Sequence, residues 1–238
     1  MSEDRPLAIV AGVGPGLGGA LCRRLGAAGY AVAGLARTSA YTDTLAEQIQ
    51  AEGGVVRMVT CELTDRGSVE QALGALEGPL GAPAVLVYNA GGFLMSPFDE
   101  IRPEEFDRLW EINCRGAFLC ARQVVPRMLE QGGGTIIFTG ASASVKPGAR
   151  FAAFGSSKFA LRGLALAMAR ELGPRGIHVA HVVIDGVIWT PRSQVWEGVT
   201  EDNTLHPDAI AETYLSIIRQ PRSAWTLELD LRPDVEPF

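Results

Sequence analysis

The sequence has few residues of the kinds that hold metals or cross-link a chain. Its 238 residues include four cysteines, which form no Cys-x-x-Cys pair, and three scattered histidines. In a chain of this size such cysteines indicate free thiols in a reducing compartment. His178 and His181 fall on opposite faces of one predicted strand and His206 precedes a proline, so we predict no metal site.

The chain also lacks an excess of positive charge and a long apolar run. Its 21 Lys and Arg residues stand against 27 Asp and Glu residues, for a formal net charge of -6. This balance disfavours nucleic acid and anionic lipid as partners. The N-terminus carries acidic residues before a very short apolar run, which is typical of neither a signal peptide nor a membrane span. We therefore expect a cytoplasmic protein whose partner is a small-molecule substrate.

Short apolar runs alternate with longer helical patterns along the whole chain. Runs rich in Val, Ile and Leu predict seven strands, at Leu7–Val10, Ala31–Ala36, Val55–Thr60, Ala84–Tyr88, Thr135–Thr139, Ile177–Ile184 and Thr226–Leu231. Helices are predicted at residues 16–29, 41–52, 67–77, 103–131, 152–173 and 207–219. This alternation predicts an α/β fold with one domain over residues 1–238, a doubly wound seven-stranded parallel sheet of the Rossmann type flanked by helices.

Ligands of such sheets bind beyond the carboxyl ends of the strands. The least regular stretch, about 190–207, follows the sixth strand there, and we expect it to form a substrate lid. Trp189 and Trp196 are candidates for an apolar substrate wall, with surface anchoring as the alternative. Five apolar residues at near-helical spacing are predicted to form core or subunit contacts, namely Phe151, Phe154, Phe159, Leu161 and Leu164.

A glycine-rich turn follows the first predicted strand. Glycines let a diphosphate approach the backbone, and the free N–H groups of the next helix attract it. Two registers fit the segment Ala11–Gly19, one with Gly14, Gly16 and Gly19 and one with Gly12, Gly16 and Gly18. We prefer the second, because it begins at the strand end and leaves Leu17 to start the helix. The turn predicts a dinucleotide site.

The end of the second strand indicates which dinucleotide is bound. An acidic residue there accepts hydrogen bonds from the ribose of NAD, whereas a basic residue accommodates the extra phosphate of NADP. This chain has Ala36 followed by Arg37, which can pair with that phosphate through two N–H groups. We therefore predict NADP(H) over NAD(H), with a solvated arginine as the alternative.

The glycine turn, Asn89-Ala90-Gly91, Asn113, a serine after the fifth strand and Lys158 occur in the order typical of the short-chain dehydrogenase/reductases, which the chain resembles over nearly its full length. The resemblance implies that Asn89, Ala90 and Gly91 support the sheet beside the adenine ribose. It also implies that Asn113 holds a water in a proton relay and that Lys158 binds the nicotinamide ribose.

Further cofactor contacts are implied by the same resemblance. Glu62 stands where the family usually has an aspartate beside the adenine, followed by Leu63. Gly186, Ile188 and Thr190 match the segment beside the nicotinamide carboxamide. The family's helices corresponding to 103–131 and 152–173 pair across two-fold axes, so we expect a homodimer or homotetramer.

The chain departs from the family at the proton donor. Phe154 stands where the family has the catalytic tyrosine of Tyr-x-x-x-Lys, and Phe151 fills the tyrosine position of the divergent enoyl reductases. Phenylalanine has no proton to give. The family serine position falls on Ala141, so Ser142 is the candidate to polarise a substrate, against a serine that only caps the turn.

These departures leave two functions open. One is an atypical reductase of a carbonyl, imine or enone, because losing a general acid typically removes about 10²–10⁴-fold of the rate and not all of it. Its proton comes from water relayed through Asn113 and Lys158, from the substrate, or from a displaced side chain such as Tyr88, Asp185 or Lys146. For Asp185, a carboxylate that caps the backbone is the preferred interpretation over a substitute acid. The other function is a nucleotide-binding sensor or partner-binding protein without catalysis.

Overall fold

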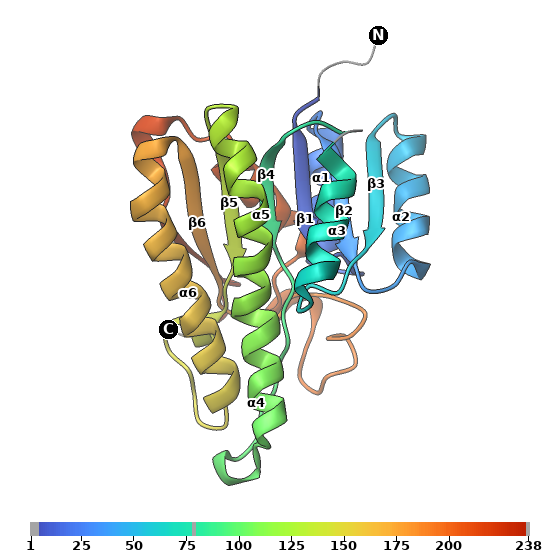
Figure 1. The fold of residues 1–238 in the computed structure, drawn as a ribbon. Coiled ribbons are helices and arrows are strands. Elements are labelled where there is room, and N and C mark those ends of the chain that lie inside the picture. The colour runs from blue at the N-terminus through green and yellow to red at the C-terminus, as the bar shows by residue number, and fades with distance from the viewer. Residues whose placement is uncertain (1–4, 78–79, 237–238) are drawn as a thin grey trace.

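The computed structural model describes residues 5–77 and 80–236, and residues 1–4, 78–79 and 237–238 of the predicted domain lie outside the described residues (Figure 1). The strands are β1 Leu7–Ala11, β2 Ala31–Ala36, β3 Val55–Thr60, β4 Pro83–Tyr88, β5 Gly134–Thr139, β6 Ile177–Ile184 and β7 Glu228–Leu231. The α-helices are α1 Leu17–Ala27, α2 Ala40–Ala51, α3 Arg66–Glu77, α4 Pro103–Trp110, α5 Gly116–Glu130, α6 Ala152–Leu172 and α7 Pro207–Ile218.

All seven strands lie in one parallel sheet with the order β3-β2-β1-β4-β5-β6-β7. This confirms the predicted doubly wound Rossmann-like fold. The winding direction reverses between β1 and β4, which are hydrogen-bonded neighbours. A crevice opens at such a point beyond the carboxyl ends of the strands, and this is where the predicted site residues gather.

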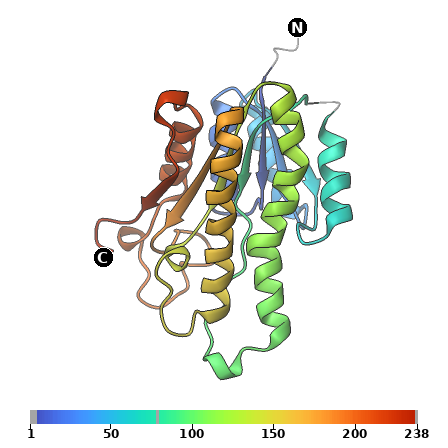
Figure 2. The ribbon, with the colours of Figure 1, turned by 60° about the vertical axis from the view of Figure 1, so that its left-hand side comes forward.

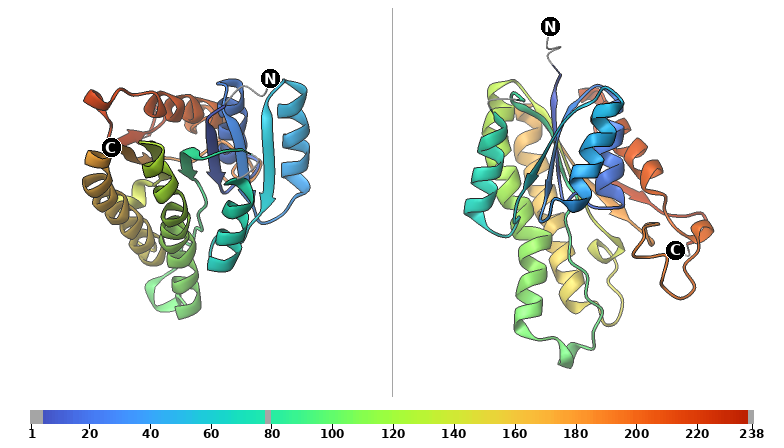
Figure 3. Two further views of the ribbon diagram at one scale, coloured as in Figure 1. Left: turned by 45° about the horizontal axis from the view of Figure 1, so that its top comes forward. Right: turned by 90° about the vertical axis from the view of Figure 1, so that its right-hand side faces the viewer.

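Two helical layers cover the sheet, one on each face (Figure 3). Successive residues of a strand point to opposite faces. Leu7, Ile9 and Ala11 of β1 therefore pack in the core formed with α3, α5 and α6. Ala8 and Val10 pack in the second core, which includes residues of α1, α2 and α7. Burial on both faces explains why the strands are almost entirely apolar.

One predicted helix is interrupted in the structure. The sequence predicts a single helix at 103–131, whereas a five-residue π-helical segment, Glu111–Arg115, separates α4 from α5. The prediction of uninterrupted α-helix was therefore wrong. The wider π turn contains Asn113, whose amide group is hydrogen-bonded on both sides to the backbone of Gly92. Such π turns occur frequently at functional sites.

The carboxyl edge of the sheet is extended by three segments. These three segments project below the strand arrowheads (Figures 1 and 2). They are α4, the first turns of α6 and the chain that follows β6. Within residues 5–77 and 80–236, none of the helices combines the length and apolar character that crossing a membrane requires.

Candidate functional site

The glycine segment that joins β1 to α1 is sterically crowded at Gly12, Gly16, Gly18 and Gly19. Gly12 has a φ of +97°, and a Cβ atom there would lie 2.5 Å from the backbone nitrogen of Ala90. A Cβ on Gly16 would lie 2.8 Å from Cγ2 of Thr190, and one on Gly18 would lie 2.9 Å from Cα of Val13. At Gly19 a Cβ would lie 2.1 Å from the Tyr41 hydroxyl oxygen, which is the end of a flexible side chain. Glycine has no Cβ and avoids these collisions.

Gly14 differs, because a Cβ there would meet nothing within 4 Å. The collisions with backbone atoms at Gly12 and Gly18 thus favour the preferred register, and α1 begins at Leu17 as that register requires. Gly14 belongs to the other register, and the packing of the protein does not require glycine there.

The segment after β4 holds this turn in place. The backbone N–H groups of Asn89 and Ala90 both donate to the Ala11 carbonyl, at 2.8 and 2.9 Å. The Asn89 side-chain amide donates to the Gly12 carbonyl at 2.9 Å. Asn89 therefore supports the turn through hydrogen bonds to its backbone.

A cavity of about 570 Å³, which we call the glycine-turn cavity, opens beside this turn. Its lining includes predicted residues from four segments, namely Gly12, Arg37, Glu62, Leu63, Asn89, Ala90 and Gly91. Arg37 is exposed and makes no hydrogen bond or ion pair within the part of the chain that the structure describes. The Glu62 carboxylate accepts hydrogen bonds from the backbone N–H and the hydroxyl of Thr64, at 3.2 and 2.9 Å.

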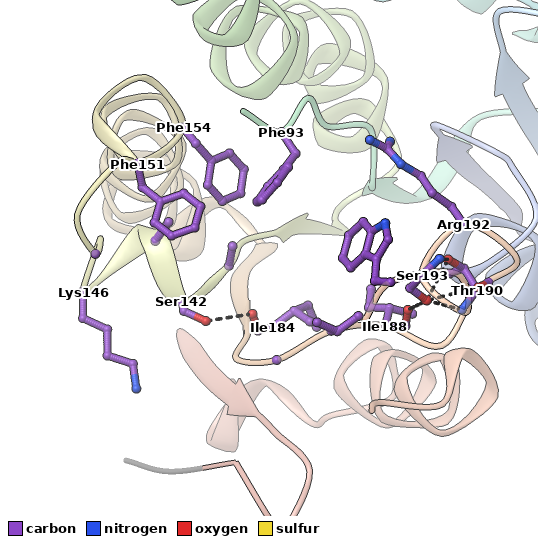
Figure 4. Close-up of a pocket in the computed structure, with 16 residues that line it drawn as sticks. Phe93, Ser142, Lys146, Phe151, Phe154, Ile184, Ile188, Thr190, Arg192 and Ser193 are labelled. Carbon is purple, nitrogen blue, oxygen red and sulfur yellow. Dashed lines mark hydrogen bonds between the residues drawn. The ribbon is translucent and has the colours of Figure 1, made fainter. Parts of the chain in front are cut away.

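A second cavity, of about 470 Å³, is shown in Figure 4, and we call it the aromatic cavity. It adjoins the glycine-turn cavity, since the two share lining residues. Phe93 and Arg192 line both cavities. Phe151, Phe154 and Trp196 also line the aromatic cavity, together with residues after β5 and β6. The prediction that Phe151 and Phe154 form core or subunit contacts was therefore wrong, whereas Leu161 of the same helix is fully buried in the core.

Lys158 and Asn113 converge on Gly91. The Lys158 ammonium donates to the Thr139 carbonyl at 2.9 Å, and burial lowers its pKa to about 8. The Asn113 amide donates to the Ser157 hydroxyl at 2.8 Å, in addition to its bonds with Gly92. A Cβ on Gly91 would lie 3.1 Å from Oδ1 of Asn113 and 3.5 Å from Nζ of Lys158. Glycine at this position lets the two side chains approach.

Two serines, Ser142 and Ser144, follow β5, and the structure places Ser142 at the aromatic cavity. Its hydroxyl lies 3.5 Å from the Ile184 carbonyl oxygen, at the limit of a hydrogen bond. Ser144 is fully buried, and its hydroxyl accepts from the backbone N–H of Ala141 at 3.1 Å. Ser142 is therefore the serine whose hydroxyl can face a ligand.

Asp185 makes ion pairs and is not the backbone cap that the sequence predicts. Its carboxylate lies 3.0 Å from Nζ of Lys146 and 2.7 Å from a guanidinium nitrogen of Arg232, with 3% of the side chain exposed. Burial acts to raise the pKa of Asp185, but the Ser142 hydroxyl and the charges of Lys146 and Arg232 outweigh it and hold the pKa below its ordinary value. At neutral pH this carboxylate has no proton to donate.

The other displaced donors considered from the sequence are also engaged elsewhere. The fully buried Tyr88 hydroxyl donates to the Ile112 carbonyl at 2.6 Å, and burial raises its pKa well above the ordinary value. Lys146 lines the aromatic cavity, but its ammonium pairs with Asp185. The Tyr88 hydroxyl is thus committed to a backbone carbonyl, and the Lys146 ammonium is held by a carboxylate.

The chain after β6 folds back over the cavity edge. Gly186, Ile188 and Thr190 line the aromatic cavity, and Ile188 is bridged to Leu205. The Ser193 hydroxyl accepts from the Thr190 backbone N–H at 2.8 Å and donates to the Ile188 carbonyl at 2.7 Å. Sequence reasoning did not identify Ser193. The spacing Thr-x-x-Ser, which favours such local hydrogen bonds, is the signal that could have found it.

Phe93 and Arg192 were also missed, because they come from irregular segments whose direction no periodicity indicates. Together the two cavities form a continuous site that is polar at the glycine turn and apolar beyond Phe93. The crowded glycines, the N-terminus of α1, Arg37 and Lys158 could hold a dinucleotide, since each offers an N–H group or positive charge to a phosphate or a ribose.

Comparisons with known proteins agree with this geometry. The family described as short chain dehydrogenase matches residues 6–197. A short-chain dehydrogenase/reductase of Armillaria gallica is 34% identical over 202 residues, which cover 84% of this chain and 77% of the relative. A metagenomic short-chain oxidoreductase crystallised with NADP has a TM-score of 0.85 at 27% identity, covering 97% of each chain. A variant of the actinorhodin polyketide ketoreductase crystallised with NADPH has a TM-score of 0.90 at 25% identity, covering 100% of each chain.

Proposed function

Because the chain belongs to the short chain dehydrogenase family, we propose that it is an NADP(H)-dependent oxidoreductase that acts without the usual tyrosine. Its substrate in this proposal is a small carbonyl, imine or enone compound. When bound, the nicotinamide supplies or accepts the hydride. The observation that carries the proposal is the continuity of the two cavities, which share Phe93 and Arg192 and so bring a nucleotide site against an apolar substrate site.

The residues of the glycine-turn cavity fit the nucleotide. Gly12, Gly16, Leu17 and Gly18 would face the diphosphate, and Arg37 would pair with the 2′-phosphate. Supporting this preference, Arg37 has no partner among the described residues, and relatives have been crystallised with NADP and NADPH. Glu62, Leu63 and the segment Asn89–Gly91 would line the adenosine, with Gly186, Ile188 and Thr190 beside the nicotinamide.

Phe154 stands where the family resemblance places the tyrosine, so proton transfer needs another route. The engaged hydroxyl of Tyr88 and the ionised carboxylate of Asp185 argue against these two residues as the donor. Lys158 would hold the ribose and, with Asn113, pass a proton from water. Its depressed pKa of about 8 suits it to that exchange near neutral pH. Ser142 would orient the polar atom of the substrate.

The proposal extends to the surroundings of the site. Residues 190–207 would act as a substrate lid, since they edge the aromatic cavity. Exposed aromatic residues lie along α4, α5 and α6, namely Phe106, Trp110, Phe118 and Phe159. They support a homodimer or homotetramer through these helices. The protein would act in the cytoplasm as a single domain over residues 1–238.

The alternative function is a nucleotide-binding sensor or partner-binding protein without turnover. Phe154 favours it, since the family's direct proton donor is missing. Tight NADPH binding with no hydride transfer to any carbonyl, imine or enone would establish this alternative. Stereospecific hydride transfer to a carbonyl, imine or enone compound would rule out this alternative function.

The decisive experiment compares titrations of NADPH and NADH with the wild type, Arg37→Ala and the control Arg175→Ala. Arg175 is exposed in the turn before β6, at the opposite edge of the sheet. We expect NADPH preference in the wild type and in the control, and at least about tenfold weaker NADPH binding in Arg37→Ala with NADH unchanged. Unchanged NADPH affinity in Arg37→Ala would reject the phosphate assignment.

A further inference from the structure

The aromatic cavity has two apolar walls that face each other. Phe93, Phe151 and Phe154 lie on one side and Ile184 and Ile188 on the other (Figure 4). The three phenylalanine rings pack together, with ring centres 5.2–6.2 Å apart. A narrow space between an aromatic wall and an aliphatic wall suits a flat molecule, because a ring can stack on the first and contact the second.

Trp196 extends the aromatic wall towards the chain after β6. Its ring is stacked with Phe93 at a centre-to-centre distance of 6.4 Å and an interplanar angle of 28°. We call Phe93, Phe151, Phe154 and Trp196 the aromatic wall. Four rings give the wall more area than a small aliphatic substrate needs, so the wall favours a ligand with an extended aromatic or conjugated system.

Most polar groups that border this cavity already have partners. The Ser193 hydroxyl is bonded to Thr190 and Ile188, and the Lys146 ammonium is paired with Asp185. Arg192 is different, since its guanidinium makes no hydrogen bond or ion pair with any residue in 5–77 or 80–236. It lies beyond Phe93, at the opposite end of the cavity from Lys146 (Figure 4).

The charges around the cavity favour an anion over a cation. Lys146 and Arg192 line it, and the Lys158 ammonium lies 6.0 Å from the centre of the Phe154 ring. The nearby carboxylate, Asp185, is paired with both Lys146 and Arg232, and Arg232 is also paired with Asp230, so Arg192 is the lining cation whose charge no carboxylate of the described residues compensates. A cationic iminium would meet uncompensated positive charge here, whereas a carboxylate could make a two-point contact with the Arg192 guanidinium.

We propose that the aromatic cavity binds a flat aromatic or conjugated molecule that carries an anionic group, with its ring against the aromatic wall and its anionic group paired with Arg192. That this ligand is the hydride acceptor rests on the proposed function. The binding itself rests on the cavity alone. The proposal narrows the substrate to a neutral carbonyl or enone group on an acidic, conjugated skeleton.

The experiment measures binding of 2-naphthoate and of its neutral analogue 2-naphthamide to the cofactor-free protein by calorimetry. The two probes share a ring system and differ in charge. We expect the wild type to bind the acid at least about tenfold more tightly than the amide, because a hydrogen bond to a charged group is stronger than one to a neutral group. Raising the salt concentration should reduce this preference.

Variants then identify the residue that causes the preference for the acid over the amide. Arg192→Gln should bind acid and amide equally, Arg192→Lys should retain part of the preference, and the remote control Arg175→Gln should retain all of it. Trp196→Ala should weaken both probes by a similar factor, since it removes stacking area and no charge. Thermal unfolding of each variant shows that it is folded before it is titrated.

Equal affinity of the wild type for both probes would overturn the proposal, as would a preference that survives in Arg192→Gln. NADPH is titrated in parallel, because Arg192 also lines the glycine-turn cavity. If Arg192→Gln loses NADPH affinity and keeps its preference for the acid, Arg192 serves the cofactor and the proposal is wrong. If the wild type binds no NADPH yet prefers the acid through Arg192, the cavity proposal stands and the proposed oxidoreductase function falls.

Discussion

The Lys158 ammonium nitrogen lies 6.0 Å from the centre of the Phe154 ring, one helical turn earlier on α6. A tyrosine at position 154 would therefore carry its hydroxyl within the field of a buried cation. Such a field stabilises a phenolate and lowers the pKa of the phenol. The surroundings of Phe154 are thus suited to a proton donor that the residue itself does not provide.

A phenol at position 154 should accelerate carbonyl reduction. We expect Phe154→Tyr to raise the rate of NADPH-dependent ketone reduction by about 100-fold or more, in line with the usual contribution of a general acid. NADPH affinity should change little, since the substitution lies in the aromatic cavity. Phe159→Tyr is the matched control, because Phe159 follows Lys158 on the same helix and is exposed. An equal gain in the control would show that the added phenol acts nonspecifically.

The buried Lys158 should make stability depend on pH in the alkaline range. Burial places its folded-state pKa at about 8, below the ordinary 10.5. Between these values the unfolded chain binds the proton that the folded chain has released, so the free energy of unfolding rises with pH across this window. The gain is about 3 kcal/mol in total.

Lys158→Met removes the titrating group and serves as the reference. Urea unfolding of both proteins without cofactor, from pH 7 to 10.5, measures the difference. The wild type should gain stability relative to the variant as the pH rises. Parallel curves for the two proteins would show that the Lys158 ammonium is solvated and not buried.

Asp185 should contribute to stability and not to the proton step. Asp185→Asn leaves Lys146 and Arg232 without their shared carboxylate, and we expect a loss of about 2 kcal/mol in the free energy of unfolding. The pKa of Asp185 is held below its ordinary value of 3.8, so its contribution is present above about pH 4 and is lost as the pH falls further. Guanidinium unfolding at pH 3 and pH 7 checks this, and a larger loss at pH 3 would contradict it.

Tyr88→Phe tests Tyr88 as a displaced proton donor. The substitution leaves the carbonyl of the half-buried Ile112 without its donor, and we expect it to lower the free energy of unfolding by about 1–2 kcal/mol. Any hydride transfer by the wild type should continue unchanged in this variant. A variant with native stability and no activity would instead make Tyr88 the displaced donor.

The glycine turn offers a comparison within one segment. Gly12→Ala and Gly18→Ala should each destabilise the protein by about 2 kcal/mol or more, because their Cβ atoms would collide with backbone atoms. Gly14→Ala should be nearly neutral, since its Cβ would meet nothing within 4 Å. Thermal unfolding without cofactor measures all three. Equal losses at Gly12 and Gly14 would reject the preferred register.

Much of the fold could be predicted because periodicity and composition report directly on strands and helices. The end of β6 was predicted to the residue, whereas β7 begins two residues later than expected. Thr226 precedes β7, and its backbone N–H bonds instead to the Gln220 side chain at 2.7 Å. A side-chain contact of this kind leaves no periodic signal, and neither does the π turn around Asn113.

The site was harder to predict, because tertiary contacts decide its chemistry. Phe154 and Leu161 follow the same apolar pattern on α6, yet one lines the aromatic cavity and the other lies in the core. The ion pair of Asp185 with Arg232 joins residues on two different segments of the chain. Sequence spacing identified Lys158 and Ser142 as candidates, but only the folded chain shows what each faces.

The interior position of β1 in the sheet has a consequence for the protein while it is being made. β1 is hydrogen-bonded to β2 on one side and to β4 on the other. Until Tyr88 has left the ribosome, β4 is incomplete. During that time β1, which is fully apolar, has one unpaired edge. Such edges invite pairing with other chains. We therefore expect early synthesis to be the stage at which β1 is most exposed to wrong pairing.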